Sequence, residues 1–223
     1  MPTMVRYQIL GQSNFAISVL LDTLRRMHVG RIAVGIVANI PPEENESLAH
    51  PYAVDGVETR EISHQGWQPD PQARLLIGSI GRARERIYDF FRARFGIGAE
   101  SYDSTIDPRA NLAFQVTVGR GVHVSPGATV APYAELGDFV VVNRNASVGH
   151  HTVLGSFVTV NPGVHVAGIC RVERGVTLGV GASVVDGVTI GEGSIIGAGS
   201  VVTRSIPPDV VAYGAPARVI RHR

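Results

Sequence analysis

The feature that most constrains this chain is a six-residue repeat in its second half. From Ile106 onward, every sixth residue is Ile, Leu or Val for seventeen consecutive positions. A fixed short period of this kind is typical of stacked repeat architectures. The repeated aliphatic positions are Ile106, Leu112, Val118, Val124, Val130, Leu136, Val142, Val148, Leu154, Val160, Val166, Val172, Leu178, Val184, Ile190, Ile196 and Val202.

A second position of the repeat is small or β-branched and stands four residues after each aliphatic one. Two such positions per six residues are too few for an amphipathic helix, which needs three or four apolar positions per seven. Glycines fill many of the remaining places, as tight corners and close-stacked backbone require. The second positions are Ala110, Val116, Val122, Ala128, Ala134, Val140, Ala146, Thr152, Val158, Val164, Cys170, Val176, Ala182, Val188, Ser194 and Ser200.

The two positions together predict a parallel β-solenoid. Three hexads would form one triangular coil of about 18 residues, so residues 18 apart would stack about 4.8 Å from each other. The segment 106–202 then supplies a little over five coils. The aliphatic and small positions would fill the core, and all other residues would face outward or form the corners.

The first hundred residues have a different pattern, in which short apolar runs alternate with helical spacing. This alternation predicts a small parallel sheet in an α/β, Rossmann-like domain. We therefore expect an α/β domain over 1–102 and the solenoid, with a short C-terminal tail, over 103–223. The expected elements are strands at 4–10, 31–37 and 75–78, helices at 18–27 and 83–95, and a polar loop at 41–47.

Composition excludes several classes of function. Lys and Arg total 20 against 19 Asp and Glu, and the chain has no basic run interleaved with aromatic residues. We therefore predict no nucleic-acid partner. The sequence has no apolar run of about 18 residues, so we predict no membrane span. The single cysteine, Cys170, excludes an internal disulfide and predicts a cytoplasmic location. Because Cys170 occupies a small inward position of the repeat, we expect it to pack in the core and not to act as a nucleophile.

Two adjacent histidines, His150 and His151, interrupt the Val- and Gly-rich repeat. They lie in the segment Val148-Gly-His-His-Thr-Val-Leu-Gly155, which is followed by Asn161-Pro-Gly-Val-His-Val-Ala-Gly168. These segments, with Ile196-Gly-Ala-Gly-Ser-Val-Val202 and 213–220, resemble the hexapeptide-repeat acyltransferases. The most similar branch contains bacterial sialic acid O-acetyltransferases and nucleotide-aminosugar N-acetyltransferases.

This resemblance implies a left-handed β-helix, a homotrimer and acetyl-CoA as the acyl donor. It also implies a nucleotide-linked sugar as the acceptor, in the synthesis of surface polysaccharides or other glycans. The chemistry needs one base, because a neutral imidazole can take the proton from the attacking amine or hydroxyl. Histidine titrates near neutrality and suits this role. No acyl-enzyme intermediate is required.

The repeat predicts that His150 faces outward at a corner. Stacking at 18-residue intervals places Gly168, Asp186 and Arg204 on the same edge of the solenoid. That edge would offer a base, an unobstructed backbone N–H and a cation for the phosphates of the donor. The alternative is that His150 and His151 are solvated surface histidines.

The resemblance also implies roles for individual residues. It makes His150 the general base and the Gly168 amide the group that polarises the thioester carbonyl. Contacts to acetyl-CoA are implied for Thr159, Val180 and Ala198.

One residue departs from the family pattern at the predicted site. Relatives place an acid beside the catalytic histidine, whereas this chain has His151 there. A neutral imidazole can orient its neighbour through a hydrogen bond but adds no negative charge. Asn143 matches an asparagine near the base in a relative, and it is equally consistent with an outward polar residue of the solenoid.

The resemblance further implies that the first domain holds the sugar nucleotide near the ends of its first two strands. The candidate residues are Gly11, Ser13, Asn14 and Asn39. Relatives have a Gly-x-x-Gly-His turn here, but this chain has Asn14 for the second glycine and Phe15 for the histidine. Phe15 excludes proton transfer at that position. The domain is therefore predicted either to bind the sugar nucleotide or to serve only as a packing lobe.

A zinc site is the main chemical alternative, because the γ-class carbonic anhydrases share this solenoid. Their signature has a second histidine five residues after the first, and here that residue is Gly155. His123 and His165 face outward but on edges other than that of His150. A catalytic zinc site wants three protein ligands and a water, so we predict no metal.

Two further functions remain open from the sequence. The first is O-acetylation of a sugar hydroxyl instead of N-acetylation. The second is a binding protein of the same fold with impaired catalysis, which the altered turn at Asn14-Phe15 and the missing acid beside His150 would explain.

Overall fold

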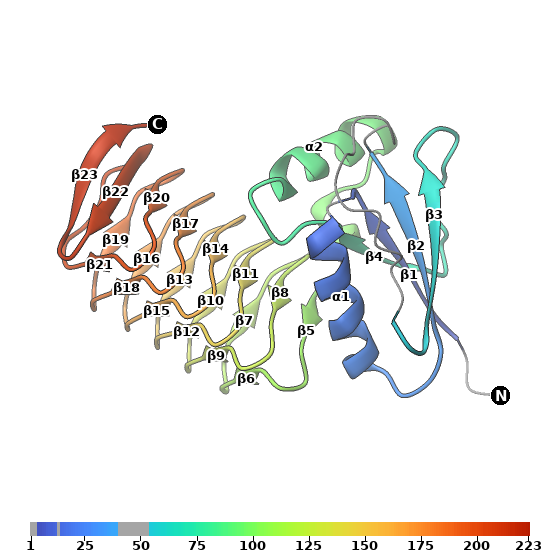
Figure 1. Cartoon of the computed structure of the whole chain (residues 1–223), viewed down its shortest axis with the longest axis horizontal. Helices are drawn as coiled ribbons and strands as arrows, with labels where there is room; N and C mark the ends of the chain where they lie inside the picture. Colours follow the sequence, from blue (N-terminus) through green and yellow to red (C-terminus); the bar gives the residue numbers. More distant parts are fainter. Residues whose placement is uncertain (1–3, 13, 40–53) are drawn as a thin grey trace. The chain divides into compact units, whose positions relative to one another are not determined.

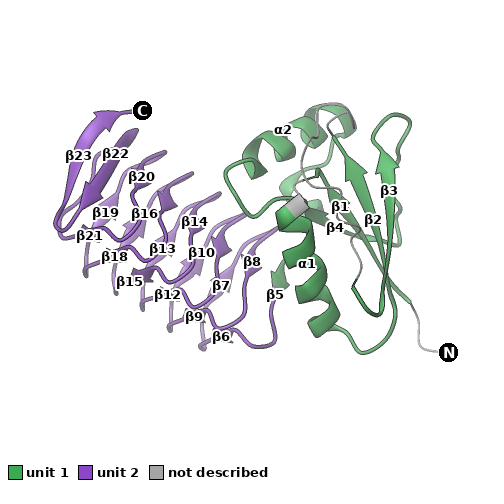
Figure 2. Ribbon diagram, viewed as in Figure 1, with its two compact units in different colours: residues 1–105 green, residues 106–223 purple. Residues whose placement is uncertain are grey.

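The structure is a computed structural model that describes residues 4–12, 14–39 and 54–223. The chain forms two compact units, residues 1–105 and 106–223 (Figure 2). None of the helices in these described stretches is long and apolar enough to span a membrane.

The first unit contains a four-stranded parallel sheet in the order β3-β2-β1-β4 (Figure 1). The small parallel sheet expected from the sequence is therefore confirmed. Strand β3 was not predicted, because it is an edge strand rich in charged residues and lacks an apolar run. The strands are β1 (Val5–Leu10), β2 (Ile32–Ala38), β3 (Val57–Ser63) and β4 (Arg74–Ile77).

Helix α1 (Asn14–Met27) packs on one face of this sheet. Its buried residues Ile17, Leu21 and Leu24 have helical spacing and meet alternate residues of the strands. The helix begins four residues earlier than the apolar pattern predicted. Helix α2 (Arg84–Phe95) and a short 3₁₀ helix, η2 (Ala99–Ser101), follow β4. The polar loop expected at 41–47 lies outside the described residues.

The second unit is the expected solenoid, in which two-residue strands stack in three parallel sheets (Figure 1). The five-stranded sheet consists of β7 (Thr117–Val118), β10 (Glu135–Leu136), β13 (Val153–Leu154), β16 (Arg171–Val172) and β19 (Thr189–Ile190). The six-stranded sheet consists of β6 (Asn111–Leu112), β9 (Thr129–Val130), β12 (Ser147–Val148), β15 (His165–Val166), β18 (Ser183–Val184) and β21 (Val201–Val202).

The third sheet has eight strands and ends in an antiparallel hairpin. The hairpin forms where the sequence suggested only a tail, and its residues Val210 and Ala212 are buried against the last coil. The strands are β5 (Thr105–Ile106), β8 (His123–Val124), β11 (Val141–Val142), β14 (Thr159–Val160), β17 (Thr177–Leu178), β20 (Ile195–Ile196), β22 (Val210–Gly214) and β23 (Ala217–His222).

The register of these sheets is the predicted 18 residues, as in the pairs Ser147 with His165 and Leu136 with Leu154. From Val122 onward the predicted inward positions are buried, and the earlier ones pack against the same core. Cys170 is among the buried residues. The six-residue pattern therefore correctly predicted both the pairing and the core.

Three corners join the sheets in every coil, and two of them concern the candidate site. The His150 corner joins the six-stranded to the five-stranded sheet and comprises 113–116, 131–134, 149–152, 167–170, 185–188 and 203–205. The Asn143 corner joins the eight-stranded to the six-stranded sheet and comprises 107–110, 125–128, 143–146, 161–164, 179–182 and 197–200.

Candidate active site

His150 lies at the corner between β12 and β13, and its side chain is exposed, as the repeat predicted. Its carbonyl oxygen accepts a hydrogen bond from the Ile169 N–H of the next coil, 2.8 Å away. The next residue, His151, has a φ of 56° and is also exposed. The backbone at His150 is thus fixed by hydrogen bonding to the neighbouring coil, while the exposed imidazole ring can contact a substrate.

The two imidazoles contact each other through their Nδ1 atoms, which are 3.2 Å apart. Such a contact requires that one Nδ1 carries a proton and the other accepts it. With the proton on His150 Nδ1, the lone pair of that ring lies on Nε2. The ring planes meet at 84°, so the contact is edge-on and does not cover the rings. His151 can therefore orient His150, but it brings no negative charge.

Gly168 lies directly against the His150 ring. A Cβ atom at Gly168 would stand 2.7 Å from both Cε1 and Nε2 of His150, so only glycine leaves room for the ring there. The stacking of these two residues in adjacent coils, expected from the 18-residue period, is confirmed.

The expectation that the Gly168 amide is unobstructed is wrong. Its N–H donates a hydrogen bond to Asp186 Oδ1 at 2.8 Å. Asp186 stands one coil further along the same corner, and its short side chain reaches back to the amide. A thioester carbonyl that used this N–H would have to displace the carboxylate.

Arg204 occupies the same corner one coil beyond Asp186, because Val184 pairs with Val202 two residues earlier. Its side chain is exposed. The predicted succession of base, amide and cation along one edge is therefore present, with Asp186 between the amide and the cation.

Two aromatic residues on the other side of His150 were not predicted. Tyr133 stacks on His151 with ring centroids 4.9 Å apart and planes at 26°. Phe114 meets Tyr133 edge-on at 5.5 Å. The 18-residue spacing from Tyr133 to His151 was visible in the sequence and could have signalled this stack.

The other residues predicted to act with His150 lie elsewhere on the solenoid. Asn143, Val180 and Ala198 are in the Asn143 corner, and Thr159 is buried in β14. Asn143 is also buried, and its Oδ1 accepts a hydrogen bond from the Arg144 N–H at 3.3 Å. A single chain therefore does not bring these four residues together with His150.

Two other histidines of the solenoid, His123 and His165, and its cysteine have local partners. His165 is exposed, as predicted, and its Nδ1 is hydrogen-bonded to Ser147 Oγ at 2.9 Å. His123 was also predicted to face outward, but it is buried, and its Nε2 is 3.0 Å from Ser125 Oγ. Burial raises the pKa of the Cys170 thiol, which makes it a poor nucleophile. Among the described residues, no group of three or more His, Cys, Asp or Glu side chains could hold a metal ion.

The candidate substrate residues of the first unit are partly placed by the structure. Asn39 Oδ1 accepts a hydrogen bond from the Gln12 N–H at 3.2 Å, which links the ends of β1 and β2. Gly11 has a φ of 87°, and a Cβ there would meet Ile87 of α2 at 2.6 Å, so both the backbone conformation and the packing favour glycine here. Ser13 lies outside the described residues; Asn14 is the first residue of α1.

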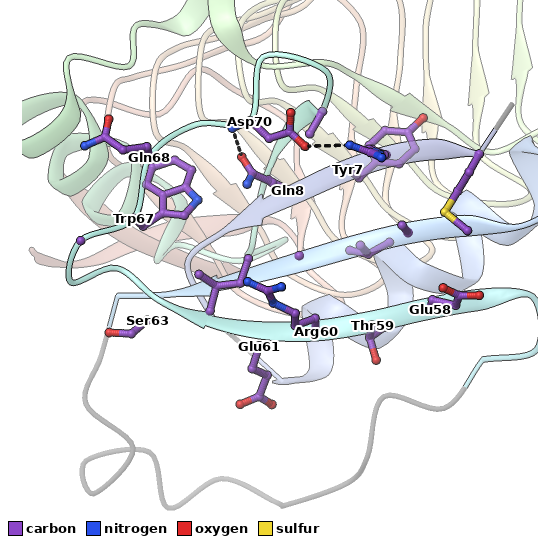
Figure 3. Close-up of a pocket in the computed structure, with 18 of the residues that line it drawn as sticks. Tyr7, Gln8, Glu58, Thr59, Arg60, Glu61, Ser63, Trp67, Gln68 and Asp70 are labelled. Atoms are coloured by element: carbon purple, nitrogen blue, oxygen red, sulfur yellow. Dashed lines mark hydrogen bonds and ion pairs between the residues drawn. The ribbon is translucent and has the colours of Figure 1, made fainter.

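The first unit also has a recess of about 930 Å³ over the face of its sheet (Figure 3). Its lining includes Arg6, Gln8, Arg60, Trp67 and Asp70, so it carries charges of both signs. Of the candidate substrate residues that the structure describes in full, neither Gly11 nor Asn39 lines it.

Comparisons with known proteins agree with this architecture. A family model described as bacterial transferase hexapeptide (six repeats) matches residues 169–204. No curated protein matches the chain. The repeat, the three stacked sheets and the similar solved structures below show that the second unit has the left-handed β-helix fold that the resemblance implied.

Several solved structures have this fold over their whole length. The acetyltransferase domain of PglB from Neisseria gonorrhoeae FA1090, in complex with acetyl coenzyme A, is 24% identical with a TM-score of 0.76, over 98% of this chain and 100% of that one. PerB from Caulobacter crescentus, in complex with CoA and GDP-perosamine, is 27% identical with a TM-score of 0.70 and 99% coverage of both chains. A variant of GDP-perosamine N-acetyl transferase from the same organism is 25% identical with a TM-score of 0.69, over 99% of this chain and 98% of that one.

Proposed function

We propose that this chain is an acetyltransferase that moves the acetyl group of acetyl-CoA to an amino group of a nucleotide-linked sugar. The observation that carries the proposal is the exposed His150 imidazole, which is oriented by His151 and lies against Gly168. The similarity to PerB, solved with CoA and GDP-perosamine, supports both substrates. Such a reaction serves the synthesis of surface polysaccharides and other glycans.

The proposed reaction is a direct transfer. His150 Nε2 takes a proton from the amine as its nitrogen attacks the thioester carbonyl; the C–S bond then breaks, and the leaving CoA thiolate takes that proton from the imidazolium, which returns His150 to its neutral form. The Gly168 N–H stabilises the developing oxyanion once Asp186 has moved away from it. Arg204, one coil beyond Asp186, supplies a cation for the phosphates of the donor.

We propose that the working form is a homotrimer. The family resemblance implies roles in donor binding or catalysis for Thr159, Val180, Ala198 and Asn143. These residues lie away from the His150 corner of the same chain. A neighbouring copy that presents its Asn143 corner to His150 would complete the site. Native mass spectrometry tests this point, since a stable monomer with full activity would contradict it.

The first unit is proposed to hold the sugar nucleotide at the ends of β1 and β2, through Gly11, Ser13, Asn14 and Asn39. The hydrogen bond between Gln12 and Asn39 supports this placement because it joins the two strand ends. A cytoplasmic location fits both proposed substrates and the unpaired Cys170.

The proposal is tested by incubating the protein with acetyl-CoA and a panel of UDP-, GDP- and dTDP-linked amino sugars and their hydroxyl analogues. We expect release of the CoA thiol together with an N-acetylated product. Acetylation of the hydroxyl analogues alone would indicate an O-acetyltransferase. Acceptor binding without any turnover would indicate a binding protein, for which the carboxylate on the Gly168 amide offers a reason.

A further inference from the structure

Three aromatic rings form a continuous row beside His150. Phe114, Tyr133 and His151 come from successive coils of the same corner, and their ring centroids are 5.5 and 4.9 Å apart. Phe114 is 65% exposed and Tyr133 is 47% exposed. The reaction proposed above uses His150 and does not account for these two exposed aromatic side chains.

The fold does not require aromatic residues at these places. The Asn143 corner repeats the same turn, and its residue equivalent to Tyr133 is Gly127. Tyr133 has a φ of 61°, a conformation that costs a non-glycine residue free energy. A large apolar side chain that is both strained and exposed is typical of a binding surface.

The row extends from His150 in the direction opposite to the proposed donor groups. Gly168, Asp186 and Arg204 follow His150 in later coils, whereas Tyr133 and Phe114 precede it. Coils lie about 4.8 Å apart. The corner therefore has a polar and cationic half on one side of the base and an aromatic half on the other.

We infer that Tyr133 and Phe114 bind the apolar face of the acceptor's sugar ring while its amino group reaches His150. This inference rests on the proposed acetyltransferase function. A pyranose is about as wide as one coil spacing, so a ring that reacts at His150 would lie along the exposed side of Tyr133, which His151 leaves uncovered, and reach the more exposed Phe114. The nucleotide is several bonds further away and would lie beyond the row. The faces of aromatic rings carry negative potential and attract the C–H groups of a sugar.

The test compares Phe114→Ala and Tyr133→Ala with the wild-type protein, using the best acceptor found in the panel. We expect the KM for the acceptor to rise about 5- to 30-fold, while the KM for acetyl-CoA changes less than about twofold. Phe114→Ala is the cleaner variant, because Tyr133→Ala also removes the ring that stacks on His151. Tyr133→Phe keeps the ring and should retain the wild-type KM.

A matched control distinguishes sugar binding from a general effect of removing surface apolar side chains. Val219→Ala removes a 44% exposed apolar side chain of β23 and should leave both KM values unchanged. An unchanged acceptor KM in both Phe114→Ala and Tyr133→Ala would overturn the inference and leave the proposed function intact. A fall in native mass in Phe114→Ala would also overturn it, since the row would then be a contact between copies. Failure of every panel acceptor with the wild-type protein would instead refute the proposed function.

Discussion

The His150 corner and the Asn143 corner have the same backbone turn but different residues at its left-handed position. In the Asn143 corner these residues are Gly127, Asn145, Gly163, Gly181 and Gly199. In the His150 corner they are Gln115, Tyr133, His151, Ile169 and Gly187.

The difference shows that the two corners carry unequal backbone strain. Glycine adopts a positive φ without a steric penalty, whereas other L-residues lose about 1–2 kcal/mol. Ile169 is the extreme case, because it is β-branched, has a φ of 58° and is 64% exposed. The Asn143 corner has glycine at four of these five places, whereas the His150 corner has a non-glycine residue at four of five and so accepts more backbone strain.

The largest effect that would sharpen this contrast is expected from Gly168→Ala. The new Cβ would lie 2.7 Å from the His150 ring, which would have to move, and a displacement of about 1 Å can reduce the rate about 100-fold. Because His150 is exposed, the ring can move without unfolding the coil. We expect kcat to fall about 100-fold with little change in Tm; an unchanged kcat would show that the position of the ring does not matter.

A smaller effect is expected at His151. His151→Ala removes the hydrogen-bond partner of His150 Nδ1 and leaves the backbone strain at position 151 unchanged. We expect kcat to fall about 3- to 10-fold, as for the loss of one hydrogen bond. His151→Glu supplies the acid found in relatives and should restore the rate. A carboxylate favours the protonated imidazole, so the acidic limb of the pH–rate profile of the Glu variant should move to higher pH. Identical profiles for the two variants would argue against an interaction between positions 150 and 151.

Gly181→Ala tests the other corner. The φ of Gly181 is 68°, and a Cβ there would meet nothing within 4 Å, so the variant introduces strain but no clash. We expect the free energy of unfolding to fall by about 1–2 kcal/mol. Urea unfolding measures this, and equal stability would show that the turn imposes no cost on alanine.

The smallest effect is expected from Ile169→Gly, the reverse change in the His150 corner. It relieves the strain at a positive φ, but it also raises the conformational entropy of the unfolded chain, which offsets part of the gain. We expect the free energy of unfolding, measured in urea, to stay within about 1 kcal/mol of the wild type. A larger loss would mean that the exposed Ile169 side chain stabilises the fold.

The sequence predicted the solenoid well because its core repeats. Each aliphatic position is tied to a fixed place on the coil, so a six-residue period determines the pairing of residues such as Ser147 and His165. It also determines that His150 points outward. The edge strand β3 and the C-terminal hairpin were missed, since neither has a periodic apolar pattern.

The details of the site could not be read from the same period. The pairing of Asp186 with the Gly168 amide depends on a side chain that reaches across one coil, and the Nδ1 contact between His150 and His151 depends on their rotamers. The burial of Asn143 likewise depends on packing around the outer side of the solenoid. The six-residue spacing determines where the backbone of each residue lies, whereas the side-chain rotamer determines which atoms the residue contacts.

The most direct test of the account is the single-turnover rate of acetyl transfer in His150→Gln. Glutamine keeps a polar side chain at the corner but cannot take a proton from the amine. We predict a rate about 10²- to 10⁴-fold below that of the wild-type protein, with acetyl-CoA still bound. A rate equal to the wild type would show that His150 is not the base and would contradict the central claim.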